Sequence, residues 1–273
     1  MNILEKRFNG ITDSTPGEEV IAFFADFRKA LEKGEVRAAE KSGNEWKVNL
    51  WVKKSIMLGF KSGVLTEMQS GIFSFFDKDT LPVQHFSPVS KVRIVPGGTS
   101  IRGGSFVAEG TILMPPAYVN IGAYVDSGCM IDSHALVGSC AQVGKNVHLS
   151  AASQIGGVLE PIGALPVIIE DNVFIGGNCG IYEGTIVQAN AVIGTGVILN
   201  ASTPVFDNTT GEFIKKTADK PLIIPKNAVV VSGSRPITSG KGIEKGIHLY
   251  CPVIIKYRDT KTNSSVTLED LLR

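Results

Sequence analysis

Aliphatic residues recur at every sixth position over much of the chain. The first run has ten members without interruption, namely Ile101, Val107, Leu113, Val119, Val125, Ile131, Val137, Val143, Leu149 and Ile155. The spacing resumes at Ile169, Ile175, Ile181, Val187, Ile193 and Leu199, and once more at Ile224 and Val230. A helix would place apolar residues three and four apart, and a half-buried strand two apart. Neither element explains a period of six.

A small residue or a valine stands four positions after nearly every aliphatic residue of the series. The first run has Ser105, Thr111, Ala117, Ala123, Cys129, Ala135, Ala141, Val147 and Ser153, and the second has Val173, Cys179, Thr185, Ala191 and Val197. A period of six is typical of a short strand followed by a corner, with three sides making a coil of about 18 residues. Coils stack about 4.8 Å apart, with the aliphatic residue inside and the small residue at the turn. The pattern predicts a mainly β chain that forms a parallel β-helix.

The two ends of the chain lack this period. Residues 16–34 combine a proline start, early acidic residues, apolar positions at helical spacing and a final glycine, which predicts an amphipathic helix. Residues 50–60 predict a second helix. We therefore expect an N-terminal helical domain over residues 1–90, a β-helix over 91–235 and a C-terminal extension over 236–273. Within the extension, residues 248–257 are strongly β-like.

Two segments, 156–168 and 201–223, interrupt the series. Insertions in a solenoid leave it as loops on one face, which is often the binding face. The second segment has the turn-prone sequence DNTTGE between two β-like runs, so it predicts a hairpin. We expect both loops to contribute to a site. Tolerated surface insertion is the alternative.

Charge and composition exclude several classes of partner. Lys and Arg number 27 and Asp and Glu 26, so no bulk charge favours nucleic acid or an anionic membrane. No apolar run is long enough to span a bilayer, and the first thirty residues do not resemble a secretory signal. The four cysteines form no CxxC pair. We expect a cytoplasmic protein with free thiols, in which Cys129 and Cys179 fill small core positions.

The stretch 125–150 holds the polar residues that could carry chemistry. His134 and His148 occupy different positions of their hexads, so we expect them not to share an ion, and we predict no metal site. Asp126 and Asp132 each follow an aliphatic residue where the chain begins to turn outward. A corner aspartate that accepts local amide hydrogen bonds is the simple interpretation of Asp126. Alternation predicts Asp132 and His134 on one face of the coil.

Seven motifs extend the interpretation beyond a bare hexapeptide repeat. The longest is LMPPAYVNIGAYVDSGCMIDSHALVGSCAQVGKNVHLSAASQIGGVLEP, and the others are LEKGEVRAAEK, WVKKSIMLGF, VRIVPGG, IRGG, VIIEDNVFIGGN and VVVSGS. Together they closely resemble the tetrahydrodipicolinate N-succinyltransferases, enzymes of the succinylase branch of lysine and diaminopimelate synthesis. The resemblance covers roughly residues 31 to 256, in order.

The resemblance implies a homotrimer of left-handed β-helices with active sites between subunits. It implies transfer of succinyl from succinyl-CoA, a cosubstrate, to tetrahydrodipicolinate in its ring-opened form, L-2-amino-6-oxopimelate, with no permanently bound cofactor. Pattern alone does not separate this activity from an N-acetyltransferase acting on the same or a related amine. A non-catalytic trimeric scaffold is the alternative from a different class.

The resemblance also implies roles for single residues. Arg93 in VRIVP falls on the family's substrate-binding arginine, and Arg102 in IRGG is a second candidate for the acceptor's carboxylates, which the planar guanidinium can bind bidentately. Asp132 in MID falls on the active-site aspartate, which would take the proton of the attacking amine or orient that amine. His134 stands where many members have tryptophan, a side chain that cannot accept a proton.

One further acidic residue of some family members falls on Gly180. Either Glu183 or Glu160 of the first inserted loop takes its place, or Asp132 acts without an acidic partner.

The sequence contains no recognisable phosphate-binding loop for CoA. Ser232 and Gly233 in VVSGS offer exposed amides for the pantetheine arm, and Arg235 offers a cation for the phosphates. Further cations in the later segments are Lys215, Lys216, Lys220, Lys226, Lys241 and Lys245.

Overall fold

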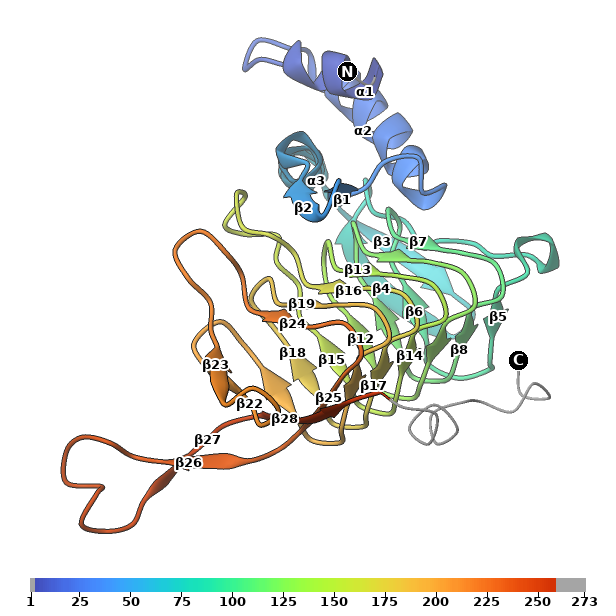
Figure 1. The fold of residues 1–273 in the computed structure, drawn as a ribbon. Helices are drawn as coiled ribbons and strands as arrows, with labels where there is room; N and C mark the ends of the chain where they lie inside the picture. Colours follow the sequence, from blue (N-terminus) through green and yellow to red (C-terminus); the bar gives the residue numbers. More distant parts are fainter. Residues whose placement is uncertain (1–2, 259–273) are drawn as a thin grey trace.

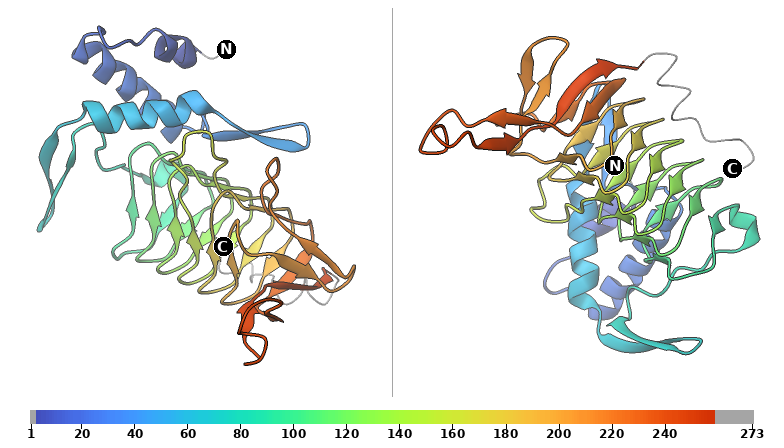
Figure 2. Two further views of the ribbon diagram at one scale, coloured as in Figure 1. Left: turned by 90° about the vertical axis from the view of Figure 1, so that its left-hand side faces the viewer. Right: turned by 90° about the horizontal axis from the view of Figure 1, so that it is seen from below.

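The computed structural model describes residues 3–258, and Figure 1 shows their elements in sequence order. Residues 1–2 and 259–273 lie outside the described part, so the end of the expected 236–273 extension lies outside it too. Helices and hairpins come first along the chain, and a solenoid of stacked coils follows. Figure 2 shows the helices lying across one side of the solenoid.

Three helices form the N-terminal part. Helix α2 (Gly17–Glu32) packs against α3 (Leu50–Ser62), and α1 (Ile3–Asn9) contacts both. Both predicted helices are therefore present. Phe24 of α2 lies against Gly59 of α3, and a Cβ built on Gly59 would collide with the Phe24 ring. The glycine therefore permits the close approach of the two helices.

Two antiparallel hairpins, one between α2 and α3 and one after α3, were not predicted. They are β1 (Ala39–Ser42) with β2 (Glu45–Val48), and β3 (Leu65–Ser70) with β4 (Phe73–Lys78). Their strands are short and of mixed polarity, so no sustained period marks them in the sequence. Hairpin β3–β4 leaves Phe73 and Phe76 largely exposed, at 62% and 70%. The limits of the three expected domains stay a prediction.

Three parallel sheets form the sides of the solenoid. The first contains β7 (Phe106–Val107), β10 (Tyr124–Val125), β13 (Gln142–Val143), β16 (Ile168–Ile169), β19 (Ile186–Val187) and β24 (Ile223–Ile224). The second contains β5 (Arg93–Ile94), β8 (Ile112–Leu113), β11 (Met130–Ile131), β14 (His148–Leu149), β17 (Phe174–Ile175), β20 (Val192–Ile193) and β25 (Ala228–Val231). The third contains β6 (Ser100–Ile101), β9 (Tyr118–Val119), β12 (Leu136–Val137), β15 (Gln154–Ile155), β18 (Gly180–Ile181) and β21 (Ile198–Leu199).

The residues inside the coils are those of the period-six series. Every aliphatic member, from Ile101 to Val230, is buried and belongs to one core cluster. The hydroxyl residues at the small positions, such as Thr111 and Ser153, are fully buried as well. Each strand pairs in parallel with the strand one coil away, as Tyr124 does with Gln142. The predicted parallel β-helix of hexapeptides is confirmed in these respects.

The N-terminal part covers the outer side of the first sheet. The Arg37 guanidinium lies 3.6 Å from the centroid of the Tyr124 ring, and its Nε donates to Gln142 Oε1 at 3.0 Å. Glu170 accepts hydrogen bonds from Lys41 Nζ at 2.7 Å and from Trp46 Nε1 at 3.0 Å. Burial alone would raise the pKa of Glu170, but these hydrogen bonds outweigh it and the pKa is lowered.

Both insertions leave the solenoid at the corner between the third and first sheets. Residues 156–167 join β15 to β16, and residues 200–222 join β21 to β24. The second insertion contains β22 (Val205–Asp207) and β23 (Glu212–Ile214), so the predicted hairpin is confirmed. Fully buried Lys53 of α3 holds the first insertion, because its Nζ donates to Ala164 O at 2.6 Å. Burial lowers the pKa of Lys53.

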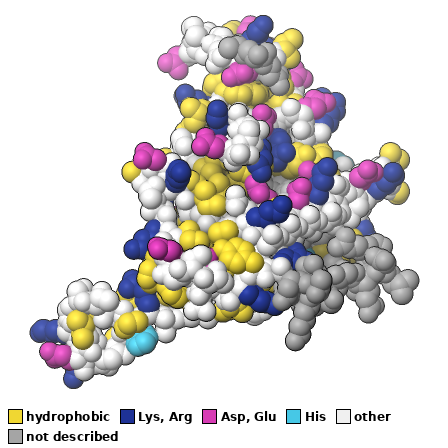
Figure 3. Space-filling model, in the orientation of Figure 1, with side chains coloured by type: hydrophobic (Ala, Val, Ile, Leu, Met, Phe, Trp, Pro, Cys, Tyr) yellow, Lys and Arg dark blue, Asp and Glu magenta, His cyan; other side chains and the backbone are white. Residues whose placement is uncertain are grey.

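The last elements extend the second sheet and form a projecting arm. Strand β28 (Val253–Tyr257) pairs antiparallel with β25. Strands β26 (Ser234–Pro236) and β27 (His248–Tyr250) make the base of an arm at the lower left of Figure 1. Figure 3 shows hydrophobic and basic side chains on this arm, where Ile243 and Ile247 are 54% and 49% exposed. The expected β segment at 248–257 corresponds to β27 and β28.

Candidate functional site

Asp132 occupies a rigid corner of the solenoid. It directly follows β11 and begins the turn toward the third sheet. Its backbone N–H donates to Leu149 O at 2.9 Å, which fixes the corner to the next coil. Its side chain is 35% exposed, and Oδ1 accepts a hydrogen bond from Ser133 N at 3.3 Å. The carboxylate is thus held by the backbone and still accessible to a ligand.

His148 is the charged or titratable neighbour that the structure places against Asp132. It lies on the outer side of β14, in register with Met130 one coil away. Its Nε2 is 3.6 Å from Asp132 Oδ2, and its side chain is 17% exposed. The sequence interpretation considered His148 only as a metal ligand. The sequence period could have predicted this proximity. His148 stands 18 residues, or one coil, after Met130, so it stacks beside Met130 and close to the corner that contains Asp132.

His134 lies in the same turn as Asp132 but at a different position. It is exposed and has a left-handed backbone, with φ at 62°, in the turn position that Cys140 and Asn146 fill at the next two corners. The expectation that alternation places Asp132 and His134 on one face depends on a strand that ends before both residues, and it stays a prediction. Strand β11 ends at Ile131, so the alternating geometry of a strand does not continue through the corner.

Arg93 and Arg102 lie on different sheets. Arg93 is exposed on β5, in the same sheet as β11 and two strands away from it, which is about 10 Å at ordinary strand spacing. Arg102 follows β6, and its guanidinium pairs with Asp77 at 2.5 Å and lies over the Phe60 ring. Within one chain, Arg93 therefore shares a sheet with the strand leading to Asp132, and Arg102 instead ties hairpin β3–β4 to the first coil.

Gly180 has a neighbour that the sequence did not predict. A Cβ built on Gly180 would lie 2.8 Å from Cζ and Oη of Tyr182, and one built on Gly156 would lie 2.7 Å from Cδ1 of the same ring. The Tyr182 ring therefore rests on the bare backbone of two coils. Glu183 is exposed and accepts a hydrogen bond from Ala201 N at 2.8 Å, while Glu160 is exposed on the first inserted loop. Neither glutamate is on the corner that holds Asp132.

The residues proposed to bind CoA follow β25. Ser232 is exposed and its Oγ donates to Gly196 O at 3.3 Å. Gly233 packs closely on Cys251 and Val253, where a Cβ would meet Cys251 O at 2.8 Å. Within residues 3–258, Arg235 has no carboxylate partner, and its buried Nε has no hydrogen-bond acceptor. This guanidinium is available to an anion.

The remaining candidates are accounted for by packing. Cys129 and Cys179 are buried in the core, as predicted, and Cys140 is buried where desolvation raises the pKa of its thiol to about 12. Asp126 Oδ1 accepts a hydrogen bond from Ser127 N at 2.7 Å, which is the local role expected of it. Between residues 3 and 258, no three His, Cys, Asp or Glu side chains gather closely enough to hold a metal ion. No helix in that range has the length and apolar character to cross a membrane.

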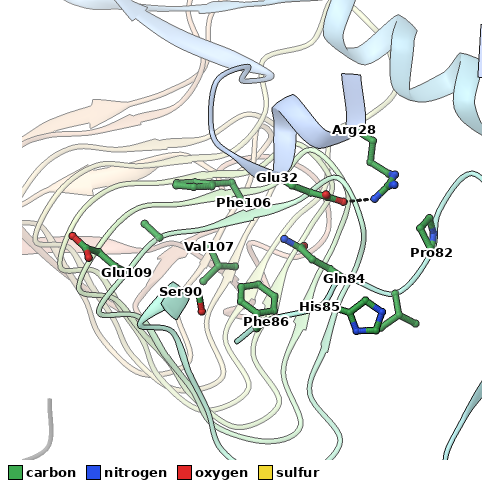
Figure 4. A pocket seen from close by; sticks show the side chains of 12 residues that line it. Arg28, Glu32, Pro82, Gln84, His85, Phe86, Ser90, Phe106, Val107 and Glu109 are labelled. Atoms are coloured by element: carbon green, nitrogen blue, oxygen red, sulfur yellow. Dashed lines mark hydrogen bonds and ion pairs between the residues drawn. The ribbon is translucent and has the colours of Figure 1, made fainter. Parts of the chain in front are cut away.

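A separate pocket opens at the start of the solenoid. It lies between α2, the segment 82–90 and the first coil, and Figure 4 shows Phe86 and Phe106 on its walls. Its charged residues are already paired, because Arg28 bonds Glu32 at 2.5 Å and Glu109 lies 3.2 Å from Lys91. The pocket therefore lacks a free charge to recognise an ionic ligand.

Stacked hexapeptide coils with an accessible corner carboxylate place the chain among the hexapeptide-repeat proteins. A family model described as the hexapeptide repeat of succinyl-transferase matches residues 166–201, and a second, described as the tetrahydrodipicolinate N-succinyltransferase N-terminal region, matches residues 2–61. A relative from Neisseria gonorrhoeae (strain NCCP11945) named 2,3,4,5-tetrahydropyridine-2,6-dicarboxylate N-succinyltransferase is 44% identical, over 100% of this chain and 98% of its own length. The Legionella pneumophila (strain Corby) relative of the same name is also 44% identical, over 95% and 91%. The chain belongs to the tetrahydrodipicolinate N-succinyltransferase family, which confirms the resemblance noted in the sequence.

Among solved structures, a putative 2,3,4,5-tetrahydropyridine-2-carboxylate N-succinyltransferase from Campylobacter jejuni is similar at 17% identity. The match covers 89% of this chain and 63% of that one, with a TM-score of 0.44.

Proposed function

We propose that the protein transfers a succinyl group from succinyl-CoA to tetrahydrodipicolinate in its ring-opened form, L-2-amino-6-oxopimelate. The products are N-succinyl-2-amino-6-oxopimelate and CoA, within lysine and diaminopimelate synthesis. The observation that carries this proposal is the accessible Asp132 carboxylate, fixed on a coil corner in a chain that belongs to this family along its whole length.

Asp132 supplies the base that the reaction needs. The acceptor's amine nitrogen bonds to the thioester carbonyl carbon, and the proton that this nitrogen loses passes to the carboxylate. The C–S bond then breaks, and the sulfur of CoA leaves with the electron pair and takes up a proton. Strands β8 and β14 pair with β11 on either side, so the corner that follows β11 is fixed and the carboxylate needs little reorganisation as the charge moves.

Arginines bind the two carboxylates of the acceptor in this proposal. Arg93 is exposed, lies on the same sheet as β11 and has no ion pair among the described residues, which supports its role. Arg102 stays a prediction as a second arginine, and it would have to exchange its bond to Asp77 for the ligand. Arg235, Ser232 and Gly233 are proposed for CoA, and the proposal is supported by the Arg235 guanidinium, which has no carboxylate partner among residues 3–258.

The proposed assembly is a homotrimer of left-handed β-helices with sites between subunits. Outward-facing residues of the second sheet support it, because Met130, Phe174 and Val192 lie outside the core cluster in one column, which His148 interrupts between Met130 and Phe174. Such a column is suited to burial against another copy of the chain. A cytoplasmic location, the lack of a permanently bound cofactor and the lack of nucleic-acid or membrane partners stay predictions.

Release of CoA thiol tests the activity. Purified protein is mixed with the ring-opened acceptor and with succinyl-CoA or acetyl-CoA, and a thiol indicator is followed. The proposal expects fast release with succinyl-CoA that depends on the acceptor. Preference for acetyl-CoA would indicate an N-acetyltransferase, and no release with either donor would indicate a scaffold. Light scattering should give three times 29.1 kDa, and a stable active monomer would contradict a shared site.

A further inference from the structure

The side chain of His148 faces the carboxylate that the proposed reaction uses. Its Nε2 lies 3.6 Å from Asp132 Oδ2, which is slightly longer than a hydrogen bond. Catalytic hydrogen bonds are often long in a ligand-free site and tighten when substrate binds. The pair comes from successive coils of one sheet, so a small side-chain rotation closes the gap without moving the backbone.

The imidazole of His148 has a neighbour on each adjacent strand of the second sheet. Its outward column contains Met130 on β11 and Phe174 on β17, in direct register with it. The Phe174 ring lies 4.9 Å from the imidazole centroid, edge to face at 67°. The backbone N–H of His148 donates to Val173 O at 3.0 Å. The contact with Phe174 limits the orientation of the imidazole, and its Nε2 lies on the side of Asp132.

Among residues 3–258, Asp132 is the charged group recorded within ion-pair distance of the imidazole. Neither β11 nor β17 contributes a titratable side chain, and Asp132 is the acidic group in the corner that follows β11. On the same sheet Arg93 lies beyond β8, on the far side of Met130. A donor on Nε2 therefore meets a carboxylate oxygen, and Oδ1 of that carboxylate already accepts a hydrogen bond from Ser133 N.

We propose that His148 is a positioning residue for Asp132, an inference that rests on the proposed function. Its Nε2–H holds Oδ2 while Ser133 N–H holds Oδ1, so the plane of the carboxylate is fixed from both ends. Each oxygen has a second lone pair, and one of these faces the acceptor's amine. Without the imidazole donor, the carboxylate rotates and meets the amine in the correct geometry less often.

Two substitutions at His148 distinguish the role of its hydrogen-bond donor from the role of its packing. His148→Gln keeps an N–H at a similar distance along the side chain, and His148→Leu keeps an apolar contact with Phe174 but has no donor. We expect His148→Leu to lower kcat by about tenfold or more, with both KM values nearly unchanged, and His148→Gln to restore most of kcat. His134→Phe is the matched control for loss of an exposed histidine in the adjoining turn. Equal kcat values for His148→Leu and His148→Gln, whether high or low, would overturn the proposal.

A second measurement does not depend on activity. Melting temperatures of Asp132→Ala, His148→Leu and the double variant form a thermodynamic cycle. We expect the two shifts not to add, because each single variant already breaks the pair. Additive shifts would overturn the pairing even if the enzyme is active. If wild-type protein releases no CoA, the proposed function fails, and the cycle alone still decides whether His148 and Asp132 interact.

Discussion

Gly180 and Tyr182 should behave as one packing unit, so that the effect of a methyl group at position 180 depends on the ring at 182. A Cβ on Gly180 would lie 2.8 Å from two atoms of the Tyr182 side chain, below the 3.0 Å that real Cβ atoms keep. Gly156 supports the other edge of the ring in the same way. The tyrosine is partly buried, so moving it away would expose apolar surface.

Two opposing effects set the size of the change. Alanine restricts the unfolded chain more than glycine does, which favours Gly180→Ala by about 0.5–1 kcal/mol where the backbone permits it. Overpacking against the Tyr182 ring costs about 1–3 kcal/mol. Gly180→Ala should therefore destabilise the wild-type background by about 0.5–2 kcal/mol. In a Tyr182→Ala background, the same substitution should stabilise by about 0.5–1 kcal/mol.

Urea unfolding at one fixed subunit concentration measures this reversal of sign. Four proteins complete the cycle, and Gly163→Ala is the matched control, because a Cβ there meets no atom within 4 Å. A coupling free energy of about 1 kcal/mol or more is expected for groups in such contact. If Gly180→Ala changes stability by the same amount with and without the ring, Tyr182 does not rest on this glycine, and the packing argument is refuted.

Three other substitutions test separate parts of the structure. Lys53→Met should speed hydrogen exchange in the loop 156–167, because the buried amine that holds the loop is lost, while the exposed neighbour Lys54→Met should leave the exchange unchanged. Folding lowers the pKa of Glu170, so the stability that its charged form contributes is fully present above the ordinary glutamate pKa of about 4.3. This contribution is lost as the pH falls through the lowered pKa of the folded state. Glu170→Gln should therefore make the melting temperature fall less steeply in that acidic range. Arg93→Lys keeps the charge but loses the bidentate fork, so the KM for the acceptor should rise while that for the CoA thioester stays the same, and an unchanged acceptor KM would make Arg93 a structural residue.

The interior of the coils was predictable because one constraint governs it. Each aliphatic residue from Ile101 to Val230 must fill the same narrow space, so the sequence repeats there residue by residue. The hairpin in the second insertion was also predictable, because turn residues separate two β-like runs. The family was recognisable from its motifs, and the full-length relatives confirm it.

The outer surface was harder to predict, because it depends on contacts between segments far apart in the chain. Arg102 pairs with Asp77 on a hairpin whose mixed polarity shows no period. The ring of Tyr182 lies over Gly180, and this contact depends on a side-chain orientation that spacing does not encode. The position of His148 beside Asp132 could have been predicted only by applying the 18-residue coil period to outward-facing residues as well as to inward-facing ones.

The relative importance of Asp132 and His134 tests the account most directly. The measurement is kcat with succinyl-CoA and the ring-opened acceptor for Asp132→Asn beside His134→Phe, with folding checked by thermal melt. Asp132→Asn removes the negative charge and should lower kcat on the order of 10²-fold or more, within the reach of general base catalysis. His134→Phe should cause only a modest loss, because His134 is an exposed turn residue and the resemblance noted in the sequence implies a tryptophan at this position in many family members. An inactive, folded His134→Phe beside an active Asp132→Asn would mean that the histidine is the base, and would contradict the account.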